Sequence, residues 1–106
     1  MHAMVRRYLV GERDIDEVAH RVDTEFAEMI SREPGFVDYQ VIDCGDGTIC
    51  SMTIFDTEEG ARRSNELAGA WVEESLVDLR LERTQAFGGE VMVSRAADAV
   101  LEPAHH

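Results

Sequence analysis

The residues that could do chemistry in this sequence are a few arginines and hydroxyl-bearing or aromatic side chains in otherwise apolar segments. A guanidinium or a hydroxyl in an apolar layer can bind an anion, and a buried tyrosine can donate a hydrogen bond to a phenol or quinol. No residue is assigned a catalytic role at this point. The candidates for lining a ligand cavity are Arg6, Arg7, Tyr8, Tyr39, Ser51, Thr53 and Trp71.

Arg6 and Arg7 are consecutive in a segment with strand character, so one side chain should point to each face of the sheet. If both faces are covered, at least one guanidinium lies in a partly buried layer and needs a carboxylate or an anionic ligand. We expect a carboxylate, within the sheet or across a dimer, in preference to a ligand. The available partners are Asp38, Asp43 and Glu90.

For the uncharged candidates, a structural role competes with a role at a ligand. A lone tryptophan on an apolar helix stripe is usually core, so Trp71 is expected to pack in the core instead of lining a cavity. Tyr8 and Tyr39 are expected at an amphipathic wall or an interface in preference to a ligand, and the same holds for Ser51 and Thr53.

Other kinds of site find little support. His20 is the one histidine away from the chain ends, and it lies off the apolar stripe of its helix, on the surface. No histidine–carboxylate pair has metal-binding spacing and no Gly-rich phosphate loop occurs, so neither a metal nor a cofactor is expected. Cys44 and Cys50 flank a predicted turn. We expect reduced, partly buried thiols there, although a disulfide across the turn is geometrically conceivable.

Composition excludes several partners. The chain has 106 residues and a formal net charge of -12, which counts against nucleic-acid backbones and anionic membranes as partners. No apolar run approaches the ~20 residues of a membrane span and no signal-peptide core begins the chain, so a cytoplasmic protein is expected. One domain over residues 1–95 and a tail over 96–106 are predicted. Val100 and Leu101 could dock the tail, and His105-His106 could be a tag remnant.

The stretch PGFVDYQVIDCGDGTICSMTIFDT, residues 34–57, predicts a hairpin with strands at 36–43 and 48–55 around Gly45-Asp46-Gly47. Phe36 is expected on the same face as Asp38. Because both strands carry large apolar side chains on both sides, both faces of the sheet should be covered.

The segments before the hairpin predict a strand over Met4–Val10 and a helix over Asp14–Ser31. Asp14 and Glu17 approximate a capping box at the start of that helix.

After the hairpin, Asp56 is the predicted cap of a second helix that runs to about Leu79. Residues 80–87 could prolong this helix or form a loop. Gly88-Gly89 should break the chain, and Glu90–Arg95 is the predicted last strand.

The order strand, helix, hairpin, helix, strand predicts an α+β fold, a ferredoxin-like βαββαβ sandwich whose antiparallel sheet has the order 4-1-3-2. Both helices return over one face. The other face would be left bare and apolar, and a second copy of the chain covers it most simply, giving a homodimer.

Four landmarks, PGFVDYQVID, FDTEE, NELAGAWVEESL and GEVMVS, carry a resemblance that spans Met4–Arg95. The chain resembles the dimeric α/β-barrel superfamily and is most similar to the small proteins grouped with the antibiotic-biosynthesis monooxygenases. The resemblance implies pairing through the sheet faces and a ligand cavity between sheet and helices. The haem-degrading relatives pair a tryptophan with an asparagine on the first strand and a later histidine, and here only Trp71 is present.

Two functions follow from this resemblance. The first is a cofactor-independent oxygenase acting on a small aromatic molecule of the phenol or quinol type. The alternative is a non-catalytic dimer that binds a small molecule or only assembles. An open pocket of ~300 Å3 or more with converging polar groups favours the first. A cavity filled by Trp71, Phe26 and Phe55 favours the second.

Overall fold

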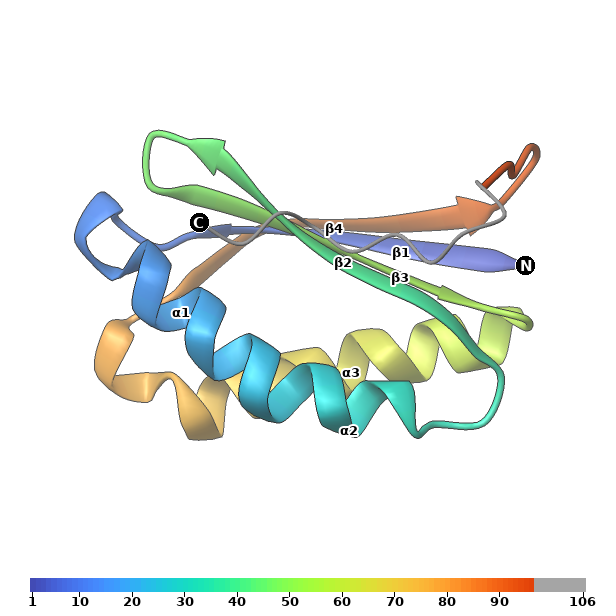
Figure 1. The fold of residues 1–106 in the computed structure, drawn as a ribbon, viewed down its shortest axis with the longest axis horizontal. Coiled ribbons are helices and arrows are strands. Elements are labelled where there is room, and N and C mark those ends of the chain that lie inside the picture. Colours follow the sequence, from blue (N-terminus) through green and yellow to red (C-terminus); the bar gives the residue numbers. More distant parts are fainter. Residues whose placement is uncertain (97–106) are drawn as a thin grey trace.

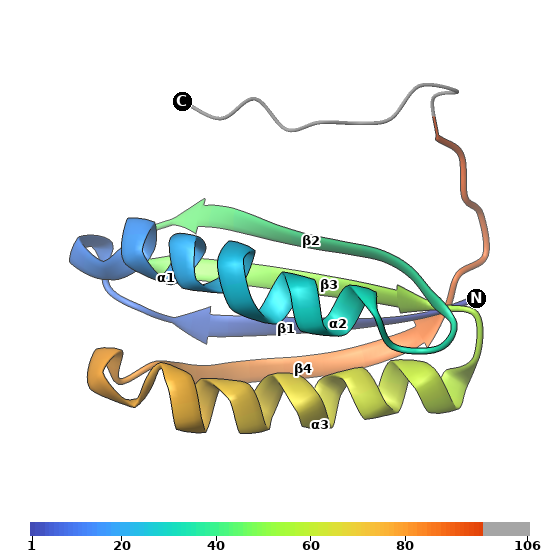
Figure 2. The same cartoon turned by 60° about the horizontal axis from the view of Figure 1, so that its bottom comes forward.

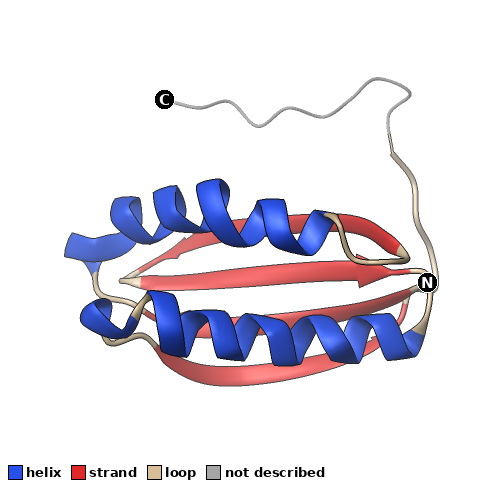
Figure 3. Cartoon of the chain, turned by 90° about the horizontal axis from the view of Figure 1, so that it is seen from below, coloured by secondary structure: helices blue, strands red, loops and turns tan. Residues whose placement is uncertain are grey.

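The computed structural model describes residues 1–96, which form one antiparallel sheet with helices packed on a single face (Figure 1). The helices form a second layer below the sheet, and two long helical rods run side by side (Figures 2 and 3). The strands are β1 (His2–Leu9), β2 (Phe36–Gly45), β3 (Thr48–Phe55) and β4 (Glu82–Glu90).

The sheet has the order β2-β3-β1-β4, and each neighbouring pair is antiparallel. This confirms the predicted ferredoxin-like order, with the first and third strands in the centre. A residue at the middle of β1 therefore has a strand on each side and a helix layer over one face, which is where a polar side chain is most desolvated.

The first helical rod consists of four elements in succession: η1 (Glu12–Asp14), α1 (Ile15–Arg21), the π-helical segment η2 (Val22–Phe26) and α2 (Ala27–Ser31). The helix predicted from Asp14 is present, but its capping box is not. Asp14 makes no side-chain capping hydrogen bond, because the chain already turns helically before it and its own angles are φ -105° and ψ -1°.

The second rod is α3 (Glu58–Ser75), followed by the short η3 (Val77–Leu79). Its cap is Thr57 and not the predicted Asp56. Thr57 is extended, so its Oγ1 can accept a hydrogen bond of 3.1 Å from the Gly60 N–H in the first turn. Of the helices within residues 1–96, none combines the length and the apolarity needed to cross a membrane.

The prediction for the last strand was wrong. β4 occupies Glu82–Glu90: it begins within the ambiguous stretch 80–87, runs through the predicted break at Gly88-Gly89 and ends at Glu90, and residues 91–96 are irregular. Arg80 has a left-handed conformation (φ 53°) that turns the chain back after η3. Gly88 lies within the strand, and only a glycine fits there, because a Cβ would collide with the Met4 side chain. The predicted tail, 96–106, lies outside the described residues except for Ala96.

The two hairpin strands differ in regularity. β3 alternates as predicted, with Ser51, Thr53 and other buried residues toward the helices. β2 has a register shift between Phe36 and Asp38. The shift brings Phe36 to the helix side, where its ring lies 5.8 Å from that of Phe55. The predicted shared face of Phe36 and Asp38 was therefore wrong.

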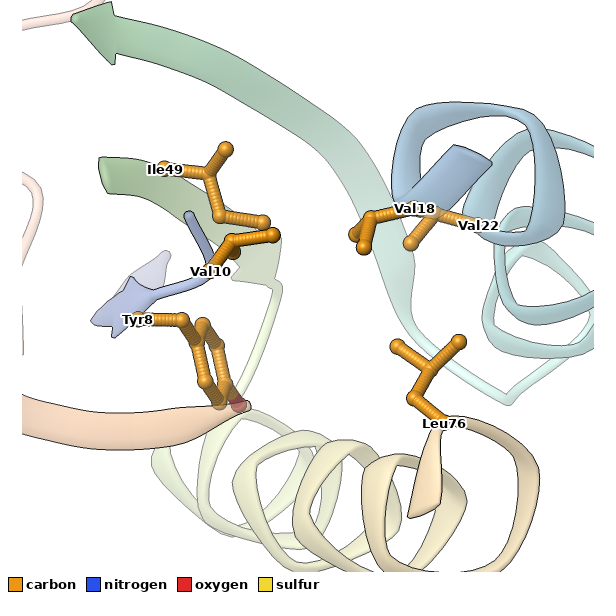
Figure 4. Packing of buried hydrophobic residues seen from close by; sticks show 6 residues of the cluster. All are labelled: Tyr8, Val10, Val18, Val22, Ile49 and Leu76. Atoms are coloured by element: carbon orange, nitrogen blue, oxygen red, sulfur yellow. The ribbon is translucent and has the colours of Figure 1, made fainter. Parts of the chain in front are cut away.

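The core has two parts. One lies near α1, where Val18, Val22 and Leu76 face Tyr8, Val10 and Ile49 (Figure 4). The other lies nearer α2 and contains Phe26, Ile30, Phe55, Ala61 and Ala68. Tyr39 and Trp71 pack against both parts, so these two aromatic residues lie where the parts meet.

The opposite face of the sheet has no helix over it in the part of the chain that the structure describes (Figure 1). Large apolar side chains remain exposed on the strands, including Leu9 at 46%, Ile42 at 52% and Phe87 at 59%. These side chains form the open face, as the two-sided pattern of the strands predicted.

Candidate functional site

Arg6 lies at the centre of β1 and is fully buried on the helix side of the sheet. Its Nε donates to Ser51 Oγ at 3.2 Å and its Nη1 donates to Thr53 Oγ1 at 3.3 Å. Both partners are neutral hydroxyls on β3. The buried Nη2 has no hydrogen-bond partner within residues 1–96. The guanidinium therefore has an unused donor group inside the protein.

The predicted carboxylate partner of Arg6 is not found. Among the described residues Arg6 forms no ion pair, and Asp38 and Asp43 instead accept hydrogen bonds from backbone amides of their own strand. Glu90 on β4 is the cross-strand partner of His2, at the start of β1 and four residues from Arg6. Desolvation by burial lowers the pKa of Arg6. The buried charge is thus held by hydroxyl dipoles alone.

A chain of hydroxyl groups orients the partner of Arg6. Thr53 Oγ1 lies 2.8 Å from Ser64 Oγ, and Ser64 Oγ donates to the Ala61 carbonyl at 2.6 Å. Because the Ser64 proton is used on that carbonyl, Thr53 must donate to Ser64. Thr53 therefore directs its lone pairs at the guanidinium of Arg6, and all three side chains are fully buried.

A second arginine approaches the same layer from β4. Arg83 donates to the Tyr8 hydroxyl from Nε at 3.2 Å and from Nη2 at 2.8 Å, and its guanidinium carbon lies 5.4 Å from the Tyr8 ring centroid. Nη2 also donates to the backbone carbonyl oxygen of Asn65 at 3.3 Å. Arg83 has no ion pair in the described part of the chain. The layer therefore carries two cations and no paired anion.

Asn65 on α3 adds an unused acceptor. Its Oδ1 is buried and makes no hydrogen bond to any described residue. Buried polar atoms are nearly always satisfied, so an orphan in a folded protein calls for a missing partner such as water or a ligand. Asn65 Oδ1 and Arg6 Nη2 are orphans of opposite kinds, one acceptor and one donor.

Three aromatic side chains pack together between the sheet and the helices. The Phe26 ring centroid lies 5.5 Å from that of Tyr39 and 5.5 Å from that of Trp71. Burial raises the pKa of Tyr39 above its usual range, so this phenol stays protonated and can donate a hydrogen bond. Trp71 is half-buried and belongs both to the core and to the wall of the cavity, so the two roles weighed for it are not exclusive.

The cavity between sheet and helices is small, about 20 Å3, and is walled by polar residues such as Tyr8, Tyr39 and Ser51 together with Trp71 and apolar side chains. That volume holds about one water molecule and no aromatic ring. The site in this structure is therefore closed.

An outer groove of about 500 Å3 lies next to the closed cavity, between the first helical rod and the hairpin. His20 lies at its rim and is exposed, as predicted. The same four side chains line both spaces and so form the wall that separates them: Val22, Tyr39, Val41 and Ile49.

Of the predicted candidates, Tyr8, Tyr39, Ser51 and Trp71 line the small cavity. Arg6 and Thr53 are fully buried on the same side of the sheet but do not line the cavity. Arg7 does not join them, because it is exposed on the open face.

Three residues of the layer were missed. Arg83 lies in the stretch left ambiguous between helix and loop, so its facing could not be derived from the sequence. Asn65 and Ser64 lie within α3, where no local pattern distinguishes them from ordinary helix residues. Within residues 1–96 no cluster of potential ligands could hold a metal ion.

No protein-family model matches the chain, and no curated protein matches it significantly in sequence. Solved structures do match it. The monooxygenase ActVA-Orf6 of Streptomyces coelicolor, in complex with nanaomycin D, aligns with a TM-score of 0.68 at 16% identity, covering 92% of this chain and 92% of that chain. A mutant of SnoaB, a cofactor-independent oxygenase from Streptomyces nogalater, gives 0.63 at 18% identity, with 88% and 94% covered.

A dimeric ferredoxin-like protein from an uncultured marine organism aligns with a TM-score of 0.67 at 13% identity, covering 91% of this chain and 97% of that chain. This chain has the ferredoxin-like fold of these proteins. The resemblance found in the sequence is thereby confirmed for the fold, because at such identities a structural likeness speaks of architecture and not of chemistry.

Proposed function

We propose that this protein is a cofactor-independent oxygenase that binds an anionic aromatic molecule between its sheet and its helices. The observation that carries the proposal is the buried guanidinium of Arg6, which has hydroxyl partners, a free Nη2 and no counter-charge among the described residues. An ion in a protein interior costs several kcal/mol unless it is compensated. A ligand anion on Nη2 would supply that compensation.

The chemistry of the layer suits a phenolate or an enolate. Arg6 would hold the ligand oxygen in its ionised form, and Asn65 Oδ1 would accept a hydrogen bond from a neighbouring hydroxyl of the ligand. Tyr39 is a neutral donor whose hydroxyl could stabilise charge that develops during the reaction. Apolar walls from the helices would keep water away from the ring.

An ionised phenol or quinol is electron-rich enough to reduce dioxygen itself. In the overall reaction one oxygen atom of O2 enters the ring as a carbonyl, the other leaves as water, and the ring supplies the two extra electrons. The protein then needs only to ionise, orient and desolvate its substrate, which are the tasks that the arginines, tyrosines and apolar wall of this layer can perform.

Binding requires the closed cavity to widen. The wall shared with the outer groove is where the cavity would widen. Val22 is the first residue of the π-helical segment η2, and Tyr39 lies on the edge strand β2. Single π-helical turns within α-helices are frequent at functional sites. An edge strand is held by one neighbour only, so separation of η2 from β2 would disturb few hydrogen bonds.

The structural likenesses support this choice among the many functions of the fold. SnoaB is a cofactor-independent oxygenase, and the ActVA-Orf6 monooxygenase is seen in complex with nanaomycin D. Both cover nearly the whole of this chain, and the proposal draws from them the type of reaction only.

One observation favours the alternative, a dimer without catalytic activity. The space between sheet and helices is filled by Phe26, Tyr39 and Trp71, and the remaining volume is about 20 Å3. Under this alternative Arg6 would be a buried structural cation, and the protein would act through assembly.

The deciding experiment measures oxygen consumption with a series of phenols, naphthols and anthrols, followed by mass spectrometry of products formed under 18O2. We expect one compound to be converted to a quinone that carries a single 18O atom, and we expect Arg6→Met to abolish the conversion. Binding of these compounds without oxygen uptake, or no binding at all, would establish the alternative.

We also propose that the open face pairs with a second copy of the chain, which would cover exposed side chains such as Ile42 and Phe87. The dimeric ferredoxin-like protein of the same fold supports this. Ile42→Glu places a charge on that face and should give a monomer by light scattering. Val77→Glu, at a residue that is 69% exposed on η3, is the matched control and should leave the mass unchanged. A monomeric wild-type chain at micromolar concentration would refute the pairing.

A further inference from the structure

Two cysteines and an arginine cluster on the open face, away from the layer described above. Cys50 is the cross-strand partner of Arg7 on one side and of Ile42 on the other. Cys44 lies two residues beyond Ile42, at the irregular end of β2, and its thiol donates to the Ile42 carbonyl oxygen at 3.7 Å, next to Cys50. Both thiols are free. Cys50 is half-buried, as predicted for the pair, and Cys44 is exposed.

Arg7 gives this cluster its chemical bias. It is the cross-strand partner of Cys50, and it forms no ion pair with any described residue. Burial alone would raise the pKa of Cys50. The neighbouring Arg7 and Cys44 side chains outweigh burial, so the pKa of Cys50 lies below its usual value.

The pKa values of the two thiols are therefore shifted in opposite directions. The neighbouring Cys50 thiol and desolvation raise the pKa of Cys44, so Cys50 ionises more readily than Cys44. A thiolate next to a cation is the reactive form of cysteine, and a second thiol within reach can resolve its oxidised product.

We propose that Cys50 and Cys44 form a peroxide-reactive thiol pair, in which Cys50 is oxidised first and Cys44 closes a disulfide. The Cys50 thiolate attacks one oxygen of hydrogen peroxide, the O–O bond breaks, and the departing hydroxide takes up a proton to form water. The resulting sulfenic acid is attacked by the Cys44 sulfur, its S–O bond breaks and a second water leaves. Two thiols are oxidised and one peroxide is reduced.

The position of the pair is consistent with this role. Cys44 and Cys50 enclose the turn around Asp46, so a disulfide would bridge the two strands of one hairpin and would need no partner chain. The turn is at the end of the open face. A second copy that covers Ile42 would also shield its cross-strand partner Cys50, so the reaction belongs to chains whose open face is free.

The test treats the purified full-length chain with hydrogen peroxide and follows the intact mass. We expect a loss of two hydrogens and a disulfide-linked peptide joining residues 44 and 50. In Cys44→Ser the reaction should stop at a sulfenic acid on Cys50, which dimedone traps. In Cys50→Ser peroxide should react several-fold more slowly.

Arg7→Gln tests the cation, with Arg13→Gln, at an exposed arginine on η1, as the matched control. Oxidation of Cys50 should slow several-fold in Arg7→Gln and keep its wild-type rate in Arg13→Gln. A chain that keeps both thiols, a disulfide that forms only between two chains, or equal rates in the two arginine variants would overturn the proposal. None of these readouts depends on oxygenase activity.

Discussion

Replacement of Arg6 by methionine should make the protein more stable and at the same time weaken its binding of anionic aromatic molecules. Arg6 is fully buried and its guanidinium contacts only neutral hydroxyls among the described residues. A charge kept in this state stabilises nothing in the free protein, and Arg6→Met retains much of the side-chain volume while removing the charge. A purely structural arginine would show the opposite effect on stability.

The magnitude follows from the contacts of Arg6. Apolar replacements of buried ion pairs are often stabilising by about 1–4 kcal/mol, and an unpaired cation belongs in the upper half of that range. This net range already contains the loss of the hydrogen bonds to Ser51 and Thr53, but the two hydroxyls stay buried without that partner, which offsets part of the gain. The free energy of unfolding should therefore rise by about 1–2 kcal/mol. A charge-assisted hydrogen bond to a ligand contributes about 1.5–3 kcal/mol, so affinity should fall about 10- to 150-fold.

Trp71 provides the assay, because it is the only tryptophan of the chain and lines the cavity. Urea unfolding followed by its fluorescence, at one fixed protein concentration, gives the stability change. Quenching of the same fluorescence by 2-hydroxy-1,4-naphthoquinone, an enol that is ionised at neutral pH, gives the affinity. Arg7→Met is the matched control, since it removes the same charge from the exposed face.

Two results would refute the reasoning. If Arg6→Met loses more than about 1 kcal/mol of stability, the guanidinium is already compensated and the unpaired-charge argument fails. If the variant binds the naphthoquinone as tightly as the wild type does, Arg6 is not the anion anchor. A similar loss of affinity in Arg7→Met would show that the effect comes from net charge and not from the buried site.

Tyr8→Phe removes the hydroxyl that accepts two N–H groups of Arg83, and urea titration should show a loss of about 1.5–3 kcal/mol. Tyr39→Phe should change stability by less than about 0.5 kcal/mol, because its hydroxyl bonds to no described residue, and equal effects of the two variants would contradict this account. Arg21 binds Asp78 at 2.8 and 3.0 Å and holds the pKa of that carboxyl below its usual value. The stabilisation by this pair is present at neutral pH and is lost as the pH falls through the lowered pKa. Asp78→Asn should flatten the acid side of the stability–pH profile, and an unchanged profile would count against the pair.

Much of the fold could be predicted from the sequence because its signals are local. Alternation in the hairpin and the Asp46-Gly47 turn located β2 and β3, and the helical stripes located both rods. The chain order then led to the observed strand order. Where the predictions failed, a distant contact decided. Gly88-Gly89 has the appearance of a break, yet β4 runs through it because both glycines pair with β1, and the Met4 side chain there leaves no room for a Cβ at position 88.

The sequence by itself determined that the two consecutive arginines would lie on opposite faces of a central strand, since strand alternation is a property of the backbone. Only the tertiary structure decided what meets Arg6. The β1–β3 register sets Ser51 opposite Arg6, and the β1–β4 register brings Arg83 to Tyr8. Packing of both helical rods leaves about 20 Å3 between the rods and the sheet. Such contacts depend on the joint placement of several elements, and no local pattern in the chain encodes them.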